Sequence, residues 1–350
     1  MRSDAVLTAI FVVIVAAVLV GEAYVYTLDN GRHSSEMTIN GDGDLEFSLT
    51  SKGSEQYSVV VSDNGKFERI EKYYIYYDAD YGSVLERPWV PIGAKELTQE
   101  YYISQLVTML NIRGVCGIEI LNAADLKIAM EKDVADGTCT SRGLAVLSGA
   151  LPDTIYGGAA GDLIFGWIED GGSLYWAGNV LGKYYATAGK AIVEVTGYEA
   201  LFFFGLSCVS DDDDRELSDI TSNSYRSSLS MMNNSIRYGI DPSGFPVVNL
   251  TVGYTKDGYC SSVLYERGSG MICVLAGDLS NNQRHDLAQI MASGLSPYSA
   301  EAGYAEGEVK RNTVKGTIDG SSFVTGNNYT AYVYYGGYFT VYGKTAGWTQ

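Results

Sequence analysis

The sequence predicts an α/β protein built on a doubly wound, mostly parallel sheet. Short apolar runs at residues 143–149 and 173–177 are typical of buried parallel strands. Between them, residues 162–170 carry apolar side chains on one face of a helix, which Gly171 and Gly172 would end. This order of strand, helix and strand recurs along the chain and indicates a sheet that binds ligands at the carboxyl ends of its strands.

Further elements extend the pattern in both directions. In chain order we expect a strand at 73–77, a helix at 98–110, a strand at 117–121, a helix at 122–130 capped by Asn122, strands at 200–204 and 271–276, and a helix at 286–292. We therefore predict an α/β domain over residues 67–296. A polar, Ser-rich and Asn-rich segment at 209–244 breaks the rhythm and is predicted to be an insertion in that domain.

The two arms outside this domain have a different pattern of polar and apolar residues. Residues 28–66 and 297–350 alternate polar and apolar residues between Gly and Asn turns, as antiparallel strands do. Each arm is too small for a core of its own. We therefore expect the arms to pack together as one small antiparallel β-domain, with the α/β domain inserted between them.

The first 27 residues predict export. Residues 5–20 are uncharged with Thr8 as their only polar residue, and Arg2 precedes them. An uncleaved transmembrane helix within residues 1–27 is favoured, and a signal peptide cleaved near residues 21–23 is the alternative. We expect a single-pass cell-membrane protein with the bulk of the chain extracytoplasmic.

Composition excludes one class of partner. The formal net charge is −18, so no basic surface is available to replace the counterions of nucleic acid. A hydrophobic fraction of 46% is enough for a real core. The expected partners are the membrane, through the N-terminal helix, and a surface glycan or protein; no cofactor is expected.

Residues 143–156 carry a family resemblance. Their apolar strand and the following Ser148–Tyr156 turn resemble the oxyanion strand of class I glutamine amidotransferases, with Ala150 at the position of the family's second glycine. Further along, the family's Gly-x-Cys-x-Gly elbow matches residues 178–182. Val180 stands at the position of the nucleophilic cysteine, and valine cannot be a nucleophile.

The general base of that family is missing as well. The family places His-Pro-Glu after a late strand, but the strand at 271–276 runs into Gly277 and Asp278, and His285 comes only at the start of the next helix. The resemblance covers residues 67–296. It implies a flavodoxin-like, catalytically degenerate domain without a catalytic residue set.

Two functions from different classes follow from this pattern. The first is a non-enzymatic module that binds a glycan or protein in the crevice above the sheet. The second is an exported hydrolase that acts on a glycoside, ester or amide through carboxylates at the strand ends or through a serine. The candidate crevice residues follow the carboxyl ends of strands: Asp78, Asp80, Ser148, Asp153, Asn179 and Asp278.

Metal sites and disulfides have weak sequence signals. The run Asp211–Asp214 could bind Ca²⁺, but it lacks the alternating ligands and central glycine of an EF-hand, so a solvated acidic loop is favoured and no metal is expected. The cysteines show no CxxC spacing, which argues against zinc. Cys260 and Cys273 flank a turn and could form a disulfide in an oxidising compartment.

Overall fold

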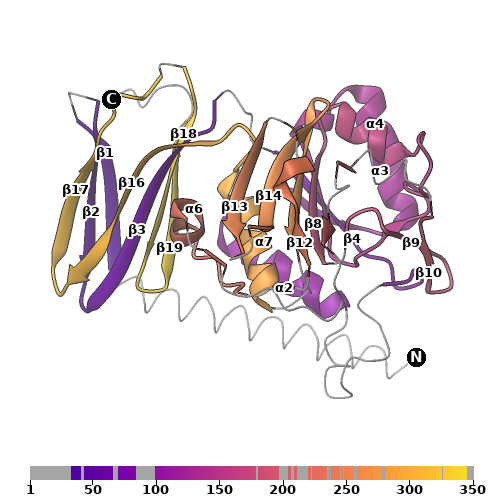
Figure 1. Ribbon diagram of the computed structural model, residues 1–350, viewed down its shortest axis with the longest axis horizontal. Helices are drawn as coiled ribbons and strands as arrows, with labels where there is room; N and C mark the ends of the chain where they lie inside the picture. Colours follow the sequence, from indigo (N-terminus) through magenta and orange to yellow (C-terminus); the bar gives the residue numbers. More distant parts are fainter. Residues whose placement is uncertain are drawn as a thin grey trace.

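The computed structural model describes residues 33–40, 43–65, 70–83, 99–178, 180–196, 204–205, 209–210, 220–221, 223–234, 236, 238–244, 246, 248–255, 258–276, 281–324 and 326–344. Two units lie side by side along the long axis of the molecule. A β-rich unit forms one end, and a large sheet with helices on both faces forms the other (Figure 1).

The large sheet is nine-stranded and mixed. Its order is β11-β12-β14-β15-β8-β6-β4-β5, with β13 also paired to β14. The strands β5, β4, β6, β8 and β15 pair parallel with one another, whereas β15 pairs antiparallel with β14 and the strands β11 to β14 pair antiparallel among themselves. The bounds are β4 (Lys72–Tyr76), β5 (Ile118–Leu121), β6 (Arg142–Val146), β8 (Ser173–Gly178), β11 (Val209–Ser210), β12 (Gly239–Ile240), β13 (Asn249–Tyr254), β14 (Cys260–Arg267) and β15 (Gly270–Ala276).

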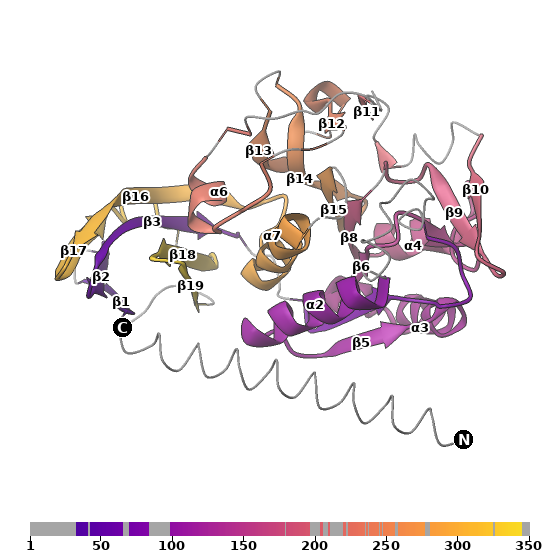
Figure 2. The same cartoon turned by 90° about the horizontal axis from the view of Figure 1, so that it is seen from below.

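Helices cover both faces of this sheet. The contacting pair α2 (Gln99–Ile112) and α7 (Asn281–Ser293) lies on one face, and the pair α3 (Ala123–Asp136) and α4 (Leu163–Glu169) lies on the other. Figure 2 shows α4 and α7 on opposite sides of β6 and β8. Asn122 caps α3 by accepting the amide N–H of Asp125, and Gly137 ends it in the left-handed conformation with φ 65°.

A small three-stranded sheet flanks the carboxyl ends of β4 and β6. It consists of β7 (Leu151–Pro152), β9 (Tyr184–Thr187) and β10 (Ala191–Glu194), in the order β10-β9-β7. Two short 3-10 turns, η3 (Cys139–Ser141) and η4 (Pro242–Gly244), connect other elements.

The β-rich unit consists of two sheets that enclose their own apolar core. One sheet has the order β1-β2-β17 and the other has the order β16-β3-β18-β19. Residues of both arms pair directly, β2 with β17 and β3 with β16 and β18, and Leu45, Leu49, Val59 and Val333 are fully buried between the sheets. The bounds are β1 (His33–Ile39), β2 (Leu45–Ser51), β3 (Ser54–Asp63), β16 (Ala300–Lys310), β17 (Thr313–Ile318), β18 (Tyr329–Tyr335) and β19 (Tyr338–Lys344).

Hydrogen bonds hold the β-rich unit against the larger one. The short helix α6 (Ser224–Ser228) contacts β3 and β18. The Ser58 and Ser228 hydroxyl oxygens lie 2.6 Å apart, and the Tyr332 hydroxyl donates to the Ser293 carbonyl at 2.9 Å. Because these groups are buried, their pairing avoids the cost of unsatisfied polar atoms and fixes how the units meet.

The predicted fold class was wrong. The protein is mostly β, with antiparallel and mixed sheets, and it is not a doubly wound α/β protein. Two segments account for the error: residues 184–194, after β8, form the β9–β10 hairpin, and residues 239–267 form antiparallel strands. Apolar periodicity over such short runs does not separate a buried parallel strand from an antiparallel one. Of the predicted strand at 200–204, only Phe204 is described.

The membrane prediction is also corrected. The predicted anchor at residues 1–27 lies outside the described residues. Among the residues that the structure does describe, no helix has the length and apolar character needed to cross a bilayer. The prediction of a single-pass membrane protein is therefore corrected to one in which no membrane span is assigned within the described part of the chain.

Cys260 and Cys273 are free thiols and form no disulfide. Both are buried in adjacent strands, but the register places Cys273 opposite Leu264 and Cys260 opposite Tyr254 and Ile240. The two sulfur atoms are therefore not cross-strand neighbours. The acidic run at 211–214 lies outside the described residues.

Candidate functional site

The candidate residues were predicted at the carboxyl ends of parallel strands. Asp78 and Asp80 follow β4, Ser148 follows β6, and Asp153 follows β7. Asn179 and Asp278 lie outside the described residues. The structure brings Asp78 and Asp153 into one cluster and leaves the side chains of Asp80 and Ser148 out of it, as the following contacts show.

Ser148 has a structural role. Its side chain is fully buried, and its hydroxyl donates to the Ala150 carbonyl at 2.6 Å. The Ser148 carbonyl accepts the Ser83 hydroxyl at 3.2 Å, which ties the turn after β6 to the segment after β4. No described histidine, carboxylate or lysine side chain bonds to the Ser148 hydroxyl. A buried hydroxyl without a base is not a nucleophile.

Asp78 organises the turn after β4. One carboxylate oxygen, Oδ1, accepts the Asp80 amide N–H at 2.9 Å, and Oδ2 accepts the amide N–H of Ala123, the first residue of α3, at 3.1 Å. A carboxylate at a helix N-terminus satisfies a free N–H and is favoured by the helix dipole. Both oxygens retain lone pairs for a further donor. The Asp80 side chain is exposed and makes no contact of its own.

Tyr81 and Asp153 connect this turn to the β9–β10 hairpin. The Tyr81 hydroxyl donates to Asp153 Oδ1 at 3.1 Å. Tyr81 forms an antiparallel bridge with Ala188, and the Asp153 amide N–H donates to the Ala186 carbonyl at 2.8 Å. Tyr81 is half-buried and Asp153 is exposed, so this part of the cluster is open to solvent.

Tyr76 is the functional candidate that sequence reasoning missed. It is the last residue of β4 and is 1% exposed, and its hydroxyl has no hydrogen-bond partner among the described residues. Burial raises the pKa of Tyr76, and the nearby charges of Asp78 and Asp153 raise it further. Burial and the hydrogen bond to Asp153 likewise raise the pKa of Tyr81. Both phenols therefore stay neutral and act as hydrogen-bonding groups.

We call Tyr76, Asp78, Tyr81 and Asp153 the carboxyl-edge cluster. The only sequence signal for Tyr76 was its place in the tyrosine-rich strand at 73–77, where alternation puts Tyr74 and Tyr76 on the same face. Val180, which stands at the expected nucleophile position, is 6% exposed and packs in the apolar core with α3 and α4. It offers no chemistry.

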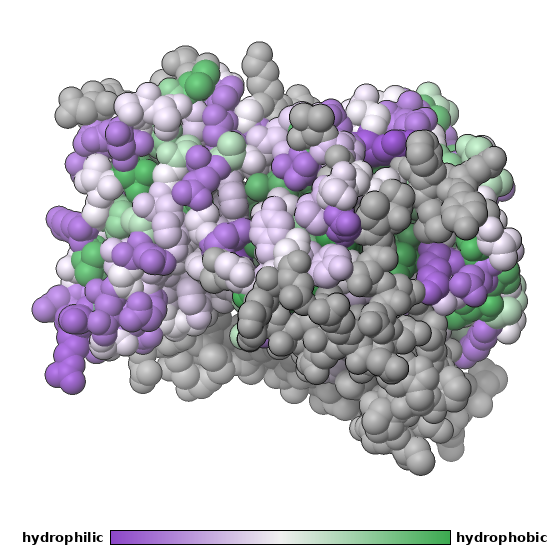
Figure 3. Space-filling view, in the orientation of Figure 1, coloured by the Kyte–Doolittle hydropathy of each residue, from purple (hydrophilic) through white to green (hydrophobic). Residues whose placement is uncertain are grey.

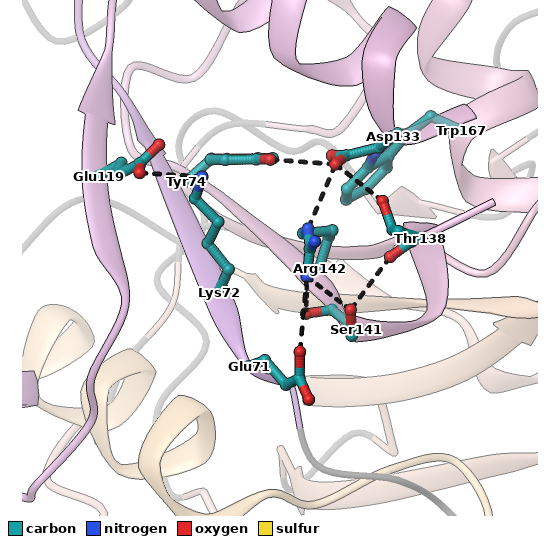
Figure 4. Close-up of polar contacts among 9 residues, drawn as sticks. All are labelled: Glu71, Lys72, Tyr74, Glu119, Asp133, Thr138, Ser141, Arg142 and Trp167. Atoms are coloured by element: carbon teal, nitrogen blue, oxygen red, sulfur yellow. Dashed lines mark hydrogen bonds and ion pairs between the residues drawn. The ribbon is translucent and has the colours of Figure 1, made fainter. Parts of the chain in front are cut away.

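A second polar cluster lies at the opposite end of the same strands (Figure 4). Asp133, from α3, accepts four hydrogen bonds: from the Tyr74 hydroxyl, Arg142 Nε and the Thr138 hydroxyl at 3.2 Å each, and from Trp167 Nε1 at 3.4 Å. We call these five residues the amino-end cluster. Three of these donors meet at Oδ1 and the fourth at Oδ2, so each carboxylate oxygen has a donor, and the carboxylate fastens α3 and α4 to the sheet.

Two other kinds of site are a metal centre and a surface groove. Among the described residues, no group of three or more His, Cys, Asp or Glu side chains is placed to hold a metal ion. A polar groove crosses the outer face of the β1-β2-β17 sheet, where its side chains come from alternating positions, and hydrophilic residues predominate at that end of the molecule in Figure 3. The groove is lined by Glu36, Thr38, Glu46, Phe47, Ser48, Lys315, Gly316 and Thr317.

Comparison with known proteins gives no family. No family model and no curated protein matches the chain. Solved structures that resemble it include an exo-β-1,4-mannosidase from Opitutaceae bacterium strain TAV5, at 12% identity and TM-score 0.35, with 65% of this chain and 34% of that one covered. A cytoplasmic protein from Salmonella typhimurium matches at 11% identity and TM-score 0.33, with 63% and 97% covered.

A third structure is a β-galactosidase from Rahnella sp. R3, at 12% identity and TM-score 0.36, with 75% of this chain and 35% of that one covered. The chain thus spans about a third of the length of each glycosidase. Likenesses this weak carry no argument about fold or activity. The comparisons give no support for the expected amidotransferase-like domain, and the chain is not assigned to that family.

Proposed function

We propose that this protein is a non-catalytic binding module whose ligand contacts the carboxyl-edge cluster. The observation that carries the proposal is that the described side chains at this edge include no activated nucleophile. The candidate serine is buried in a turn, the nucleophile position is an apolar core residue, and both tyrosines are held neutral. The groups that stay available, Asp78, Tyr81 and Asp153, can accept or donate hydrogen bonds but have no partner that would activate a nucleophile.

A hydroxyl-rich ligand suits these groups best. Carboxylates accept hydrogen bonds from sugar hydroxyls, and neutral phenols both donate and accept. A surface glycan is therefore the preferred ligand class, and a protein partner is the second. The rigid frame also favours binding, because Asp78 is anchored to α3 and Asp153 to the β9–β10 hairpin.

The test is a glycan array probed with the full-length protein, run beside a turnover screen of glycoside, ester and amide substrates. We expect binding without turnover. Asp153→Asn is the informative variant, because Asn keeps an oxygen that can accept the Tyr81 hydroxyl while the charge is lost. Asp80→Asn is its matched control, since Asp80 lies in the same turn with a side chain that makes no contact.

The expected result is that D153N binds at least about tenfold more weakly and D80N binds as the parent does, given what a charged hydrogen bond contributes. Turnover by the parent protein that disappears in D153N would overturn the proposal in favour of a hydrolase. Binding that is equal in the parent, D153N and D80N would place the ligand elsewhere on the molecule.

A further inference from the structure

Among the described residues, the carboxyl-edge cluster carries negative charge, and neither Asp78 nor Asp153 forms an ion pair. The two residues are linked through Ala123, whose amide N–H donates to Asp78 Oδ2 at 3.1 Å and whose carbonyl accepts the hydroxyl of Thr154, the neighbour of Asp153, at 2.8 Å. Lys190 lies on the neighbouring turn, where its amide N–H donates to the Asp80 carbonyl at 3.0 Å, and its exposed side chain forms no ion pair with a described carboxylate. Two carboxylates held near each other favour a positively charged guest.

The hydrogen-bonding capacity that is left open at this site is of two kinds. Asp153 Oδ2 accepts no hydrogen bond, and each Asp78 oxygen accepts only one. Within the part of the chain that the structure describes, the Tyr76 hydroxyl is buried and has no hydrogen-bond partner. A ligand that satisfies this site must therefore bring several hydrogen-bond donors for the carboxylates and one hydrogen-bonding group for the neutral phenol of Tyr76. An ammonium group brings three N–H donors together with the charge.

A metal ion fits this site less well than an organic cation. Ca²⁺ takes six to eight oxygen ligands, and three of the four carboxylate oxygens at this site already accept hydrogen bonds from the protein. The described residues contain no group of three potential metal-ligating side chains. Since the open phenol hydroxyl needs a hydrogen-bond partner close to the charge, the guest should carry a hydroxyl near its amine.

We propose that the carboxyl-edge cluster binds the ammonium group of an amino sugar, with Asp78 and Asp153 accepting its N–H groups and Tyr76 bonding to a neighbouring sugar hydroxyl. This inference rests on the proposed binding function and names its ligand class. Because the Tyr76 hydroxyl is shielded from solvent, the Tyr81–Asp153 hydrogen bond opens as the ligand enters. Within the described residues, this is the one hydrogen bond that the Tyr81 side chain makes.

The test is calorimetric titration of the full-length protein with two oligosaccharides of equal length. One is a β-1,4-linked glucosamine tetramer at a pH where its amines are protonated, and the other is the N-acetylated tetramer. They share ring hydroxyls and linkage and differ in charge. We expect the free-amine tetramer to bind at least about tenfold more tightly, as loss of a charge-assisted hydrogen bond implies.

Three variants locate the site. We expect D153N and Tyr76→Phe each to weaken binding of the free-amine tetramer by about tenfold, and D80N to leave it within about twofold. Thermal unfolding of each variant without ligand shows whether it is folded. Asp80 supplies the control for the general attraction of a cation to a protein of net charge −18.

The outcomes separate this inference from the proposed function. Equal binding of both tetramers, lost in D153N, would overturn the ammonium inference and leave the glycan-binding module standing. Equal loss in D153N and D80N would show only general charge attraction and would overturn the site. Equally tight, D153N-sensitive binding of a tetralysine peptide would overturn the saccharide assignment and indicate a protein amine. Binding of neither tetramer would overturn the inference, and the array would then decide the proposed function separately.

Discussion

The two polar clusters at opposite ends of β4 differ in whether the buried tyrosine hydroxyl has a hydrogen-bond partner within the described residues. Tyr74 and Tyr76 lie two residues apart on the same face of the same strand, and both side chains are buried. The Tyr74 hydroxyl donates to Asp133 at 3.2 Å, whereas the Tyr76 hydroxyl has no partner. The amino-end cluster is complete by itself. The carboxyl-edge cluster is incomplete, and an incomplete buried polar group is where a ligand gains free energy.

The largest effect is expected at the centre of the closed cluster. Asp133→Ala should lower the free energy of unfolding by about 3 kcal/mol or more, because it leaves buried donors of Tyr74, Trp167 and Arg142 without their acceptor. Alanine is a good helix former, so α3 itself is not weakened. Urea denaturation measures the effect.

Asp136→Ala is the matched control, because Asp136 is an exposed residue of the same helix and its loss should cost less than about 0.5 kcal/mol. A loss below about 1 kcal/mol for D133A would mean that the amino-end cluster is not a closed structural unit, and the comparison with the carboxyl edge would lose its meaning.

The next effect concerns Cys139, which lies beside the amino-end cluster. Burial raises the pKa of the Cys139 thiol to about 11, with further contributions from the charges of Asp133 and Asp170. At pH 8, iodoacetamide should therefore modify Cys139 at least about a hundredfold more slowly than an ordinary thiol, since the thiolate is the reactive form. Peptide mass spectrometry over time measures the rate, and the exposed Cys116 is the internal reference.

The same thiol gives the sign of a pH dependence. Its folded-state pKa lies above the unfolded value, so its contribution to stability is fully present below the unfolded pKa and is lost as pH rises through about 11. Modification of Cys139 as fast as Cys116 at neutral pH would show that this end of the sheet opens readily. D133A should increase the Cys139 rate if the cluster is what keeps it closed.

The same elements show which parts of the fold could be predicted from the sequence. Asn122 was expected to cap a helix, and it does so through the Asp125 amide, because capping depends on residues only three positions apart. The hairpin that turns between Cys260 and Cys273 was expected and is present, whereas the strands at 239–240 and 249–254 were not foreseen, because runs this short carry a weak periodic signal. The predicted fold class failed for that reason.

The candidate site residues were also predicted only in part. Asp78 and Asp153 were chosen because residues after strand ends converge at one edge, and the structure links them through Ala123, which bonds to Asp78 and to Thr154, the neighbour of Asp153. Asp80 and Ser148 satisfied the same rule, but one side chain is exposed without contacts and the other is buried in a turn. Tyr76 could not be chosen, because nothing in the run 73–77 tells which hydroxyl finds a partner.

A smaller effect is expected from Tyr74→Phe. The substitution removes one of the four hydrogen bonds to Asp133 and keeps the ring that packs in the core. It should cost about 1 kcal/mol of unfolding free energy, the usual value of one buried hydrogen bond. Urea denaturation under the conditions used for D133A gives the number. A neutral result would mean that the remaining three donors satisfy Asp133 equally well.

The smallest effect on stability, and the one that sharpens the comparison most, is expected from Tyr76→Phe. The same change two residues along the strand removes a buried hydroxyl that makes no hydrogen bond, so the unfolding free energy should stay unchanged or rise by up to about 1 kcal/mol. A loss as large as that of Y74F would show that the Tyr76 hydroxyl is already satisfied in the free protein, by a bound water for example, and that the carboxyl edge is as closed as the amino end. Unchanged stability with weakened binding of the amine-bearing tetramer is the combination that only an open site produces, because a purely structural hydroxyl would move the first measurement and leave the second alone.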